Sequence, residues 1–344
     1  MKISKALAAL AIFALTAGIS GCSVNSSEHD SAKPTIRIGY QTFPSGDLIV
    51  KHNRWLEDAL PDYNITWTKF DSGADVNTAF IAKAIDFGAL GSSPVARGLS
   101  APLNIPYQVA FILNVAGDNE ALVARPGTGI SSVGDLRGKR VATPFASTAH
   151  YSLLAALAQA GVSPSEVTLI DLAPQAILAA WDRGDIDAAY SWLPTLDELQ
   201  KTGTTLVTSR ELAQSGIPTL DLLTVSTPFA KDNPKVVDIW RQQQNRALTV
   251  IHQDPTAAAQ AVSAESGIST EVAASQLAKT GFLTPDQLTT PLWLGTEDKP
   301  GNLAVNLRSA SKFLAEQHQI PEAAPLSVFQ NAIYTIGLTD AAAG

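Results

Sequence analysis

The sequence has 344 residues, of which 45% are hydrophobic and 16% charged, and its formal net charge is −8. This composition is typical of a globular protein and excludes a disordered or fibrous chain. The acidic balance argues against a nucleic-acid partner, because proteins that bind nucleic acid need a basic face. The length exceeds what one compact core usually holds, so we expect two lobes.

The N-terminal residues 1–21 predict a signal for export. Lys2 and Lys5 precede an apolar run, Leu7 to Ile19, that is too short to span a membrane stably. The run leads into Ile-Ser-Gly-Cys, which resembles a bacterial lipobox and predicts lipidation of Cys22 after cleavage. An ordinary signal peptide with a chance cysteine, or a short membrane anchor, is the alternative.

Cys22 is the only cysteine. The mature chain would therefore have no disulfide, no thiolate nucleophile and no cysteine-based metal site. A lipidated cysteine would hold the protein at a membrane face without inserting it. Residues 22–34 are small, polar and aperiodic, which predicts a flexible tether.

After the tether, short β-like runs alternate with amphipathic segments. The predicted strands are residues 35–40, 65–70, 87–91, 107–114, 121–125, 139–144, 167–172, 188–192, 206–208 and 220–225. The predicted helices are residues 48–60, 75–84, a helix from Pro94, 133–138, 149–160, 176–183, 234–251, 256–264, 270–279 and 303–318. Strands separated by helices indicate βαβ units with parallel pairing.

Two crossings of the chain, near residues 121–125 and 218–225, suggest two α/β lobes. We expect residues 35–120 and 222–344 to form the first lobe and residues 121–221 the second. Ligands of such sheets bind beyond the carboxyl ends of the strands, where loops meet helix N-termini. Two lobes that face each other would make a cleft that can close by a hinge.

Four short polar loops follow predicted strand ends, at residues 39–42, 71–74, 91–94 and 145–151. In the last two, hydroxyl residues precede a helix whose first amides lack intrahelical partners. Such a terminus binds an anion through N–H groups, hydroxyls and the positive end of the helix dipole. Pro94 suits a first helical turn, because its missing N–H would have had no partner. The same serines and threonines could instead be ordinary N-caps.

Seven blocks occur in an order that resembles one known family. They are YQT (40–42), KFDSGA (69–74), LGSSP (90–94), NEALV (119–123), PFASTAHYSLLAAL (144–157), AAWDRGDIDAAYSWLP (179–194) and PTLDLL (218–223). Over residues 36–225 the chain resembles the taurine-binding components of bacterial ABC transporters, which belong with the aliphatic-sulfonate and thiamine-precursor binding proteins. The resemblance implies a two-lobed type II periplasmic binding protein fold, each lobe a mixed α/β sheet flanked by helices. It also implies a membrane permease and its ATPase as partners, and no cofactor.

Taurine is a zwitterion, so its pocket needs two unlike ends. The resemblance places the sulfonate against Ser92, Ser93, Ser147 and Thr148, with Tyr151 and Gln41 as further donors. The candidates for the ammonium are Asp221, Glu120 and Asp71, with Tyr40 and Trp192 as aromatic flanks. Each has a plain structural alternative: a turn for Asp71, an exposed strand start for Glu120, a hinge strand for Asp221 and a lobe interface for Trp192.

Enzymatic interpretations find little support. The five histidines are scattered without metal-ligand spacing, and no G-x-S-x-G motif is present. His150 lies beside Ser147, but anion binding at a helix N-terminus explains the pair without catalysis.

The sequence therefore predicts a secreted, lipid-anchored binding protein for taurine that serves an ABC importer, at the cell surface or in a periplasm. Other alkanesulfonates or a thiamine precursor are the alternative ligands. An enzyme of thiamine-precursor synthesis and a purely structural lipoprotein are more distant alternatives.

Overall fold

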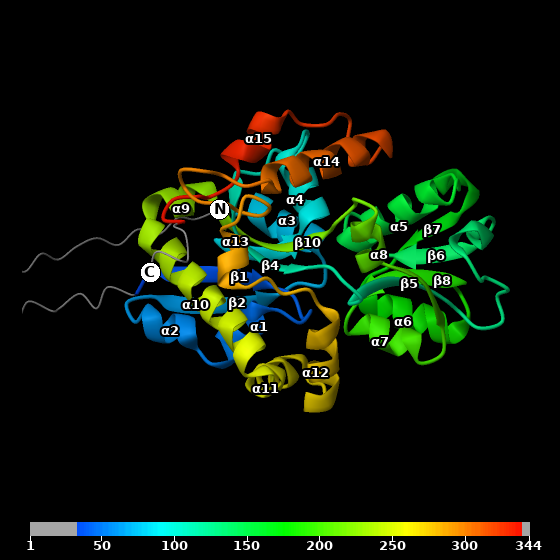
Figure 1. Ribbon diagram of the computed structural model, residues 1–344, viewed down its shortest axis with the longest axis horizontal. Coiled ribbons are helices and arrows are strands. Elements are labelled where there is room, and N and C mark those ends of the chain that lie inside the picture. The colour runs from blue at the N-terminus through cyan, green and yellow to red at the C-terminus, as the bar shows by residue number, and fades with distance from the viewer. Residues whose placement is uncertain (1–32, 339–344) are drawn as a thin grey trace, which may run out of the picture. The chain divides into compact units, whose positions relative to one another are not determined.

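The computed structural model describes residues 33–338 (Figure 1). The predicted signal peptide, Cys22 and almost all of the predicted tether lie outside the described residues, so they stay predictions. Within the described part of the chain, no helix combines the length and apolar character that crossing a membrane requires.

The first sheet has five strands in the order β2-β1-β3-β10-β4. Their bounds are β1 Thr35–Tyr40, β2 Asn64–Lys69, β3 Phe87–Gly91, β4 Tyr107–Val115 and β10 Leu220–Ser226. Strand β1 pairs in parallel with β2 and β3, whereas β10 runs antiparallel between β3 and β4. In this register Asp221 lies opposite Gly91 on one side and Asn114 on the other.

The second sheet also has five strands, in the order β7-β6-β8-β5-β9. Their bounds are β5 Glu120–Ala124, β6 Arg140–Thr143, β7 Thr168–Asp171, β8 Ala188–Trp192 and β9 Thr204–Thr208. Strand β6 pairs in parallel with β7 and β8, and β5 runs antiparallel to β8 and β9. The predicted α/β class with two mixed sheets is confirmed. The parallel pairing that the alternation indicated does not extend to β5 and β10, the strands that follow the two crossings, which run antiparallel to their neighbours.

Helices cover both sheets (Figure 1). Around the first sheet they are α1 Gly46–His52, α2 Trp55–Ala59, α3 Gly73–Ile81, α4 Ser92–Leu99, α9 Thr227–Asp232, α10 Pro234–Gln253, α11 Pro255–Ser266, α12 Thr270–Lys279, α13 Pro285–Leu288, α14 Leu303–Glu316 and α15 Leu326–Asn331. Around the second they are α5 Thr148–Gln159, α6 Pro174–Arg183, α7 Thr195–Gln200 and α8 Ser209–Gln214, with 3-10 turns at Val133–Leu136 and Pro164–Glu166. The single helix predicted over 48–60 is two helices, because Arg54 adopts a left-handed conformation with φ of 55°.

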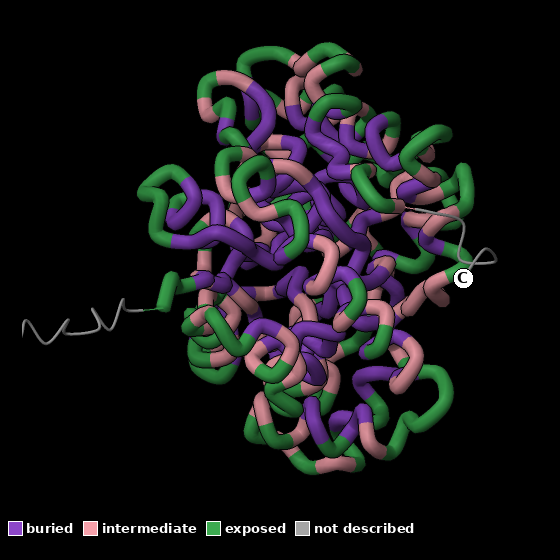
Figure 2. Tube along the Cα trace, turned by 90° about the vertical axis from the view of Figure 1, so that its left-hand side faces the viewer, coloured by how far each residue is buried: buried purple, intermediate pink, exposed green. Residues whose placement is uncertain are grey.

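The core lies under the central strands, which Figure 2 shows as buried segments inside an exposed outer shell. Every residue of β3 and β5 is buried. Helix α10 packs on the first sheet, where the Trp240 indole stacks on Phe87 at 4.4 Å between ring centroids. This packing holds the strand ends in fixed positions.

The antiparallel course of β5 and β10 has a direct consequence for the edge of each sheet. Because β10 runs opposite to β3, its first residues lie beside the last residues of β3. In the same way the first residue of β5, Glu120, pairs with the last residue of β8, Trp192. Polar residues at strand starts and strand ends are thereby brought to the same edge.

Candidate ligand-binding site

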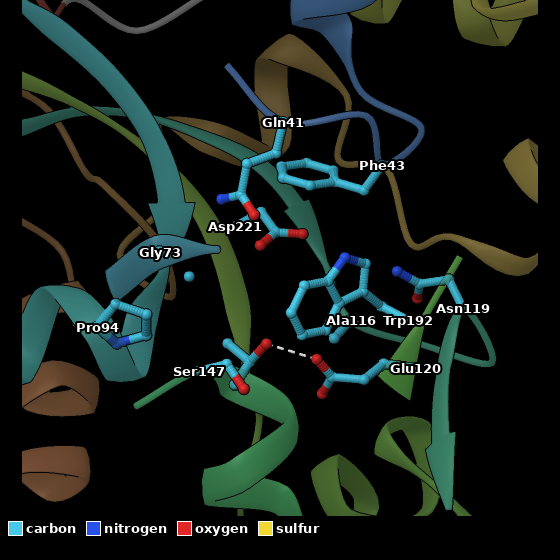
Figure 3. Close-up of a pocket in the computed structure, with 12 residues that line it drawn as sticks. Gln41, Phe43, Gly73, Pro94, Ala116, Asn119, Glu120, Ser147, Trp192 and Asp221 are labelled. Carbon is cyan, nitrogen blue, oxygen red and sulfur yellow. Dashed lines mark hydrogen bonds between the residues drawn. The ribbon is translucent and has the colours of Figure 1, made fainter. Parts of the chain in front are cut away.

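A cavity lies where these strand edges meet, with about 400 Å³ of space between atoms, its opening included. Both sheets and the helix termini beside them contribute to its wall (Figure 3). The lining residues are Gln41, Phe43, Gly73, Gly91, Pro94, Ala116, Asn119, Glu120, Ser147, Thr148, Trp192 and Asp221.

The charged side chains of the cavity wall are all acidic. Glu120 and Asp221 are the charged residues that line it, and the lining contains no lysine, arginine or histidine. An anionic group bound here would be held by neutral donors and helix dipoles, and a cationic group would find carboxylates.

Glu120 is buried and tied to hydroxyl groups from two helices. Its Oε2 accepts a hydrogen bond from Thr148 Oγ1 at 2.5 Å, and its Oε1 accepts from Ser209 Oγ at 2.6 Å and Ser152 Oγ at 3.2 Å. Burial raises the pKa of Glu120, while these hydroxyls lower it. The exposed strand-start position considered from the sequence is wrong, because Glu120 is only 3% exposed.

Asp221 is the freer of the two carboxylates. Burial and the negative charge of Glu120 raise the pKa of Asp221 to about 7, although the Asn114 amide lowers it. Among the described residues Asp221 has no basic partner within ion-pair distance. A carboxylate in this position gains from a ligand cation, which restores the charged form that burial disfavours.

The N-terminus of α5 forms the opposite end of the cavity. Ser147 is its N-cap and accepts a hydrogen bond from His150 N at 3.1 Å, so the alternative N-cap role holds for Ser147. Ser147 and the first helical residue, Thr148, also line the cavity. In Figure 3, Ser147 and Glu120 lie toward one end of the cavity, and the Asp221 carboxylate and Gln41 amide toward the other. The two functions, cap and cavity wall, are therefore compatible.

Gly91 lets the two sheets approach each other at this point. A Cβ atom on Gly91 would lie 2.4 Å from Thr148 Cγ2, although the backbone at Gly91 (φ −70°) suits any residue. The close approach of strand β3 to helix α5 thus depends on the missing side chain.

We expect Gly91→Ala to weaken ligand binding by about 1–3 kcal/mol, because the added methyl group overpacks the contact with Thr148. Calorimetry with the ligand measures the loss. Gly134→Ala is the matched control, because its new Cβ would come no closer than 3.5 Å to Ser132. Equal affinities for the two variants would show that the contact does not influence binding.

The remaining predicted site residues do not line this cavity. Tyr40 packs edge-on against Trp67, and Lys51 Nζ lies 5.3 Å from the centre of the Tyr40 ring. The Ser92 hydroxyl accepts a hydrogen bond from Leu220 N at 3.1 Å, and Ser93 is buried. Tyr151 packs on Phe313 at 4.8 Å. Asp71 lines a neighbouring compartment.

Phe43 and Asn119 line the cavity but were not predicted from the sequence. Asn119 Oδ1 accepts a hydrogen bond from Gly117 N at 2.6 Å, which fixes the turn before Glu120. Its position beside a predicted carboxylate in the NEALV block was the available signal. Phe43 is an apolar residue in a loop, and no local pattern marked it as a ligand contact.

His150 is buried and held in place by neighbouring groups. Its ring stacks on Phe145 at 4.4 Å and its Nδ1 accepts a hydrogen bond from Ala146 N. Burial lowers the pKa of His150 to about 4, so its ring is neutral at neutral pH. Within residues 33–338, no group of three histidine, cysteine or acidic residues is placed to hold a metal ion.

A comparison with known families gives this geometry a context. The sequence profile described as NMT1/THI5 like matches residues 69–258, more than half of the chain. The chain belongs to the NMT1/THI5-like family. Within it, the chain is 46% identical over 173 residues to the taurine-binding periplasmic protein of Escherichia coli (strain K12). That match covers 50% of this chain and 53% of the relative, so it spans about half of the relative's length.

Two further proteins are similar over longer stretches. A Bacillus subtilis (strain 168) protein, whose name proposes aliphatic sulfonates as its ligands, is 30% identical over 67% of this chain and 69% of its own. The alkanesulfonate-binding protein SsuA from Xanthomonas axonopodis pv. citri, solved with bound MOPS, superposes with a TM-score of 0.74. It shares 22% identity and covers 88% of this chain and 99% of that structure. The predicted periplasmic-binding-protein fold is confirmed, and these relatives are named as binding proteins.

Proposed function

We propose that this protein captures taurine, 2-aminoethanesulfonate, outside the cytoplasm and delivers it to the permease and ATPase of an ABC importer. One observation carries the proposal: the cavity has the Asp221 carboxylate toward one end, a hydroxyl-rich helix N-terminus beside Glu120 toward the other, and no basic side chain in its lining. A zwitterion with an ammonium and a sulfonate has the complementary charges.

The sulfonate end would lie at α5. Thr148 and Ser147 surround the first turn, whose free N–H groups and dipole stabilise an anion without a compensating lysine or arginine. The ammonium end would lie at Asp221, with the half-buried Trp192 indole beside it. Glu120 then has a supporting role, because the hydroxyls of Thr148, Ser152 and Ser209 occupy its oxygens.

Calorimetry of the protein without its first 33 residues tests this function. We expect taurine to bind with higher affinity than ethanesulfonate, sulfate or a hydroxymethylpyrimidine compound, since only taurine carries both an ammonium and a sulfonate. Stronger binding of ethanesulfonate than of taurine would favour the alternative, a binder of amine-free aliphatic sulfonates. The names of the Bacillus subtilis and Xanthomonas relatives support that alternative.

Lipid attachment through Cys22 is the second part of the proposal and rests on the lipobox-like residues 19–22. We expect Cys22→Ala to leave ligand affinity unchanged and to release the protein from membranes. Fractionation of cells that express each form measures this. Equal membrane association of the two forms would exclude the anchor.

A further inference from the structure

A second compartment adjoins the cavity on the far side of two shared side chains. Gln41 and Trp192 line both spaces, so they form the wall between them. This outer compartment has about 390 Å³ of space, its opening included. The proposed function assigns no role to it.

Two polar side chains of the outer compartment, Thr195 and Lys69, lack partners within the described part of the chain. Thr195 is 2% exposed and lines the compartment, and its buried Oγ1 forms no hydrogen bond. A buried hydroxyl without a partner costs free energy, so the geometry at Thr195 favours a bound group that hydrogen-bonds to it. Lys69, exposed at the end of β2, also lines the compartment and forms no ion pair among residues 33–338.

The ten-residue helix α6 begins at the same place. Its first two residues, Pro174 and Gln175, line the outer compartment, and its N-cap, Ala173, forms no side-chain hydrogen bond. The first-turn amides after Pro174 are therefore available to an anion, and the dipole of α6 favours negative charge there. The Asp71 carboxylate lines the same compartment and would repel a simple anion but attract an ammonium.

We propose that the outer compartment is a second ligand subsite, which takes the sulfonate group of another ligand molecule, or free sulfate, at Thr195, Lys69 and the start of α6. A zwitterionic ligand bound there would place its ammonium toward Asp71. Because Gln41 and Trp192 separate the two spaces, a molecule in the outer subsite occupies a position from which it can enter the inner cavity once this wall opens. The subsite stands whether or not taurine is the inner ligand.

Titrations with sodium sulfate and with taurine test the outer subsite in the full chain. Tryptophan fluorescence is the signal, since Trp192 faces both spaces, and sodium chloride at equal ionic strength is the reference. In wild type, we expect sulfate to bind even when the inner cavity is saturated with taurine. Thr195→Val and Lys69→Gln should each weaken sulfate by about fivefold to tenfold. Lys235→Gln, which removes an equal charge from an exposed lysine of α10, should change nothing.

Asp71→Asn distinguishes the two possible ligands of the outer subsite, free sulfate and the sulfonate of a zwitterionic ligand. Loss of the carboxylate should strengthen sulfate at the outer subsite by about threefold and weaken the second, low-affinity binding of taurine by a similar factor. Changes in opposite directions are not expected from a structural role of Asp71. Loss of the sulfate signal at taurine concentrations that saturate only the inner cavity, or equal sulfate affinities in wild type, Thr195→Val and Lys69→Gln, would overturn the proposal.

The test of the outer subsite and the test of the taurine function can fail independently of each other. If taurine does not bind the inner cavity, the taurine function fails, and the sulfate affinities of Thr195→Val and Lys69→Gln still decide the outer subsite. If taurine binds once and no outer signal follows, only the outer subsite fails.

Discussion

Asp221→Asn is expected to weaken taurine binding by about 2–5 kcal/mol, because it removes a half-buried charge that would pair with the ligand ammonium. Asparagine keeps the size and the hydrogen-bonding capacity of the side chain, so its place opposite Gly91 and Asn114 in the first sheet is preserved. Calorimetry with taurine and with ethanesulfonate, which lacks the amine, measures the effect. The affinity for ethanesulfonate should fall far less in Asp221→Asn than the affinity for taurine, or should rise.

Glu120→Gln provides the matched control within the same cavity. Its oxygens accept hydrogen bonds from Thr148, Ser152 and Ser209, so its loss should disturb the α5 terminus and weaken taurine and ethanesulfonate by similar amounts. If Asp221→Asn also weakens both ligands equally, Asp221 only supports strand β10 and the ammonium is bound elsewhere.

The affinity for taurine is expected to rise with pH up to about 7. In the free protein burial and the charge of Glu120 raise the pKa of Asp221 to about 7, so Asp221 is mostly protonated below that pH. A ligand ammonium pairs with the ionised form, and the proton must leave on binding. Binding should therefore be about tenfold weaker at pH 6 than at pH 8, and about a hundredfold weaker at pH 5. Above pH 7 the affinity should level off while the amine stays protonated.

Other groups around Asp221 do not produce the same profile. The pKa of His150 is lowered to about 4, so it does not titrate between pH 5 and pH 8. Because the pKa of Glu120 is also raised, its protonation would add to the loss of taurine affinity at low pH. Glu120 is still present in Asp221→Asn, so this contribution would persist in the variant. A profile in Asp221→Asn as steep as that of wild type would assign the pH dependence to another group. Melting temperatures of the free protein across the same pH range separate unfolding from binding.

Much of the fold could be predicted from local pattern. Strands β3 and β8 and helix α12 have the predicted bounds, because each combines a clear period with clear end signals. Helices α7, α8, α9, α13 and α15 were missed, since elements of four to six residues are too short to show a helical period. The direction of β5 and β10 was missed for another reason. Strand direction depends on where the chain crosses between sheets, which no local window contains.

The candidate site divides in the same manner. Gln41, Glu120, Ser147, Thr148, Trp192 and Asp221 were named from sequence blocks and line the cavity, although their roles stay predictions. Tyr40 was named with its neighbour Gln41, but successive side chains of an extended strand point in opposite directions. Tyr151 was named with Thr148 from the same helix. Thr148 and Ser152, four residues apart, share the face toward Glu120, and Tyr151 turns toward Phe313.

Glu120 accepts hydrogen bonds from several neighbouring hydroxyls and Asp221 does not, and this difference affects how such proteins can diverge. Replacing Glu120 would strand three hydroxyl groups on two helices, so that position can change only together with its neighbours. Asp221 can be replaced without a change in its neighbours. A single nucleotide change converts an aspartate codon into an asparagine codon. After gene duplication, one copy could move from amine-bearing to amine-free sulfonates in one step while its fold persists. An organism could in this way acquire access to a second sulfur source without building a new binding protein.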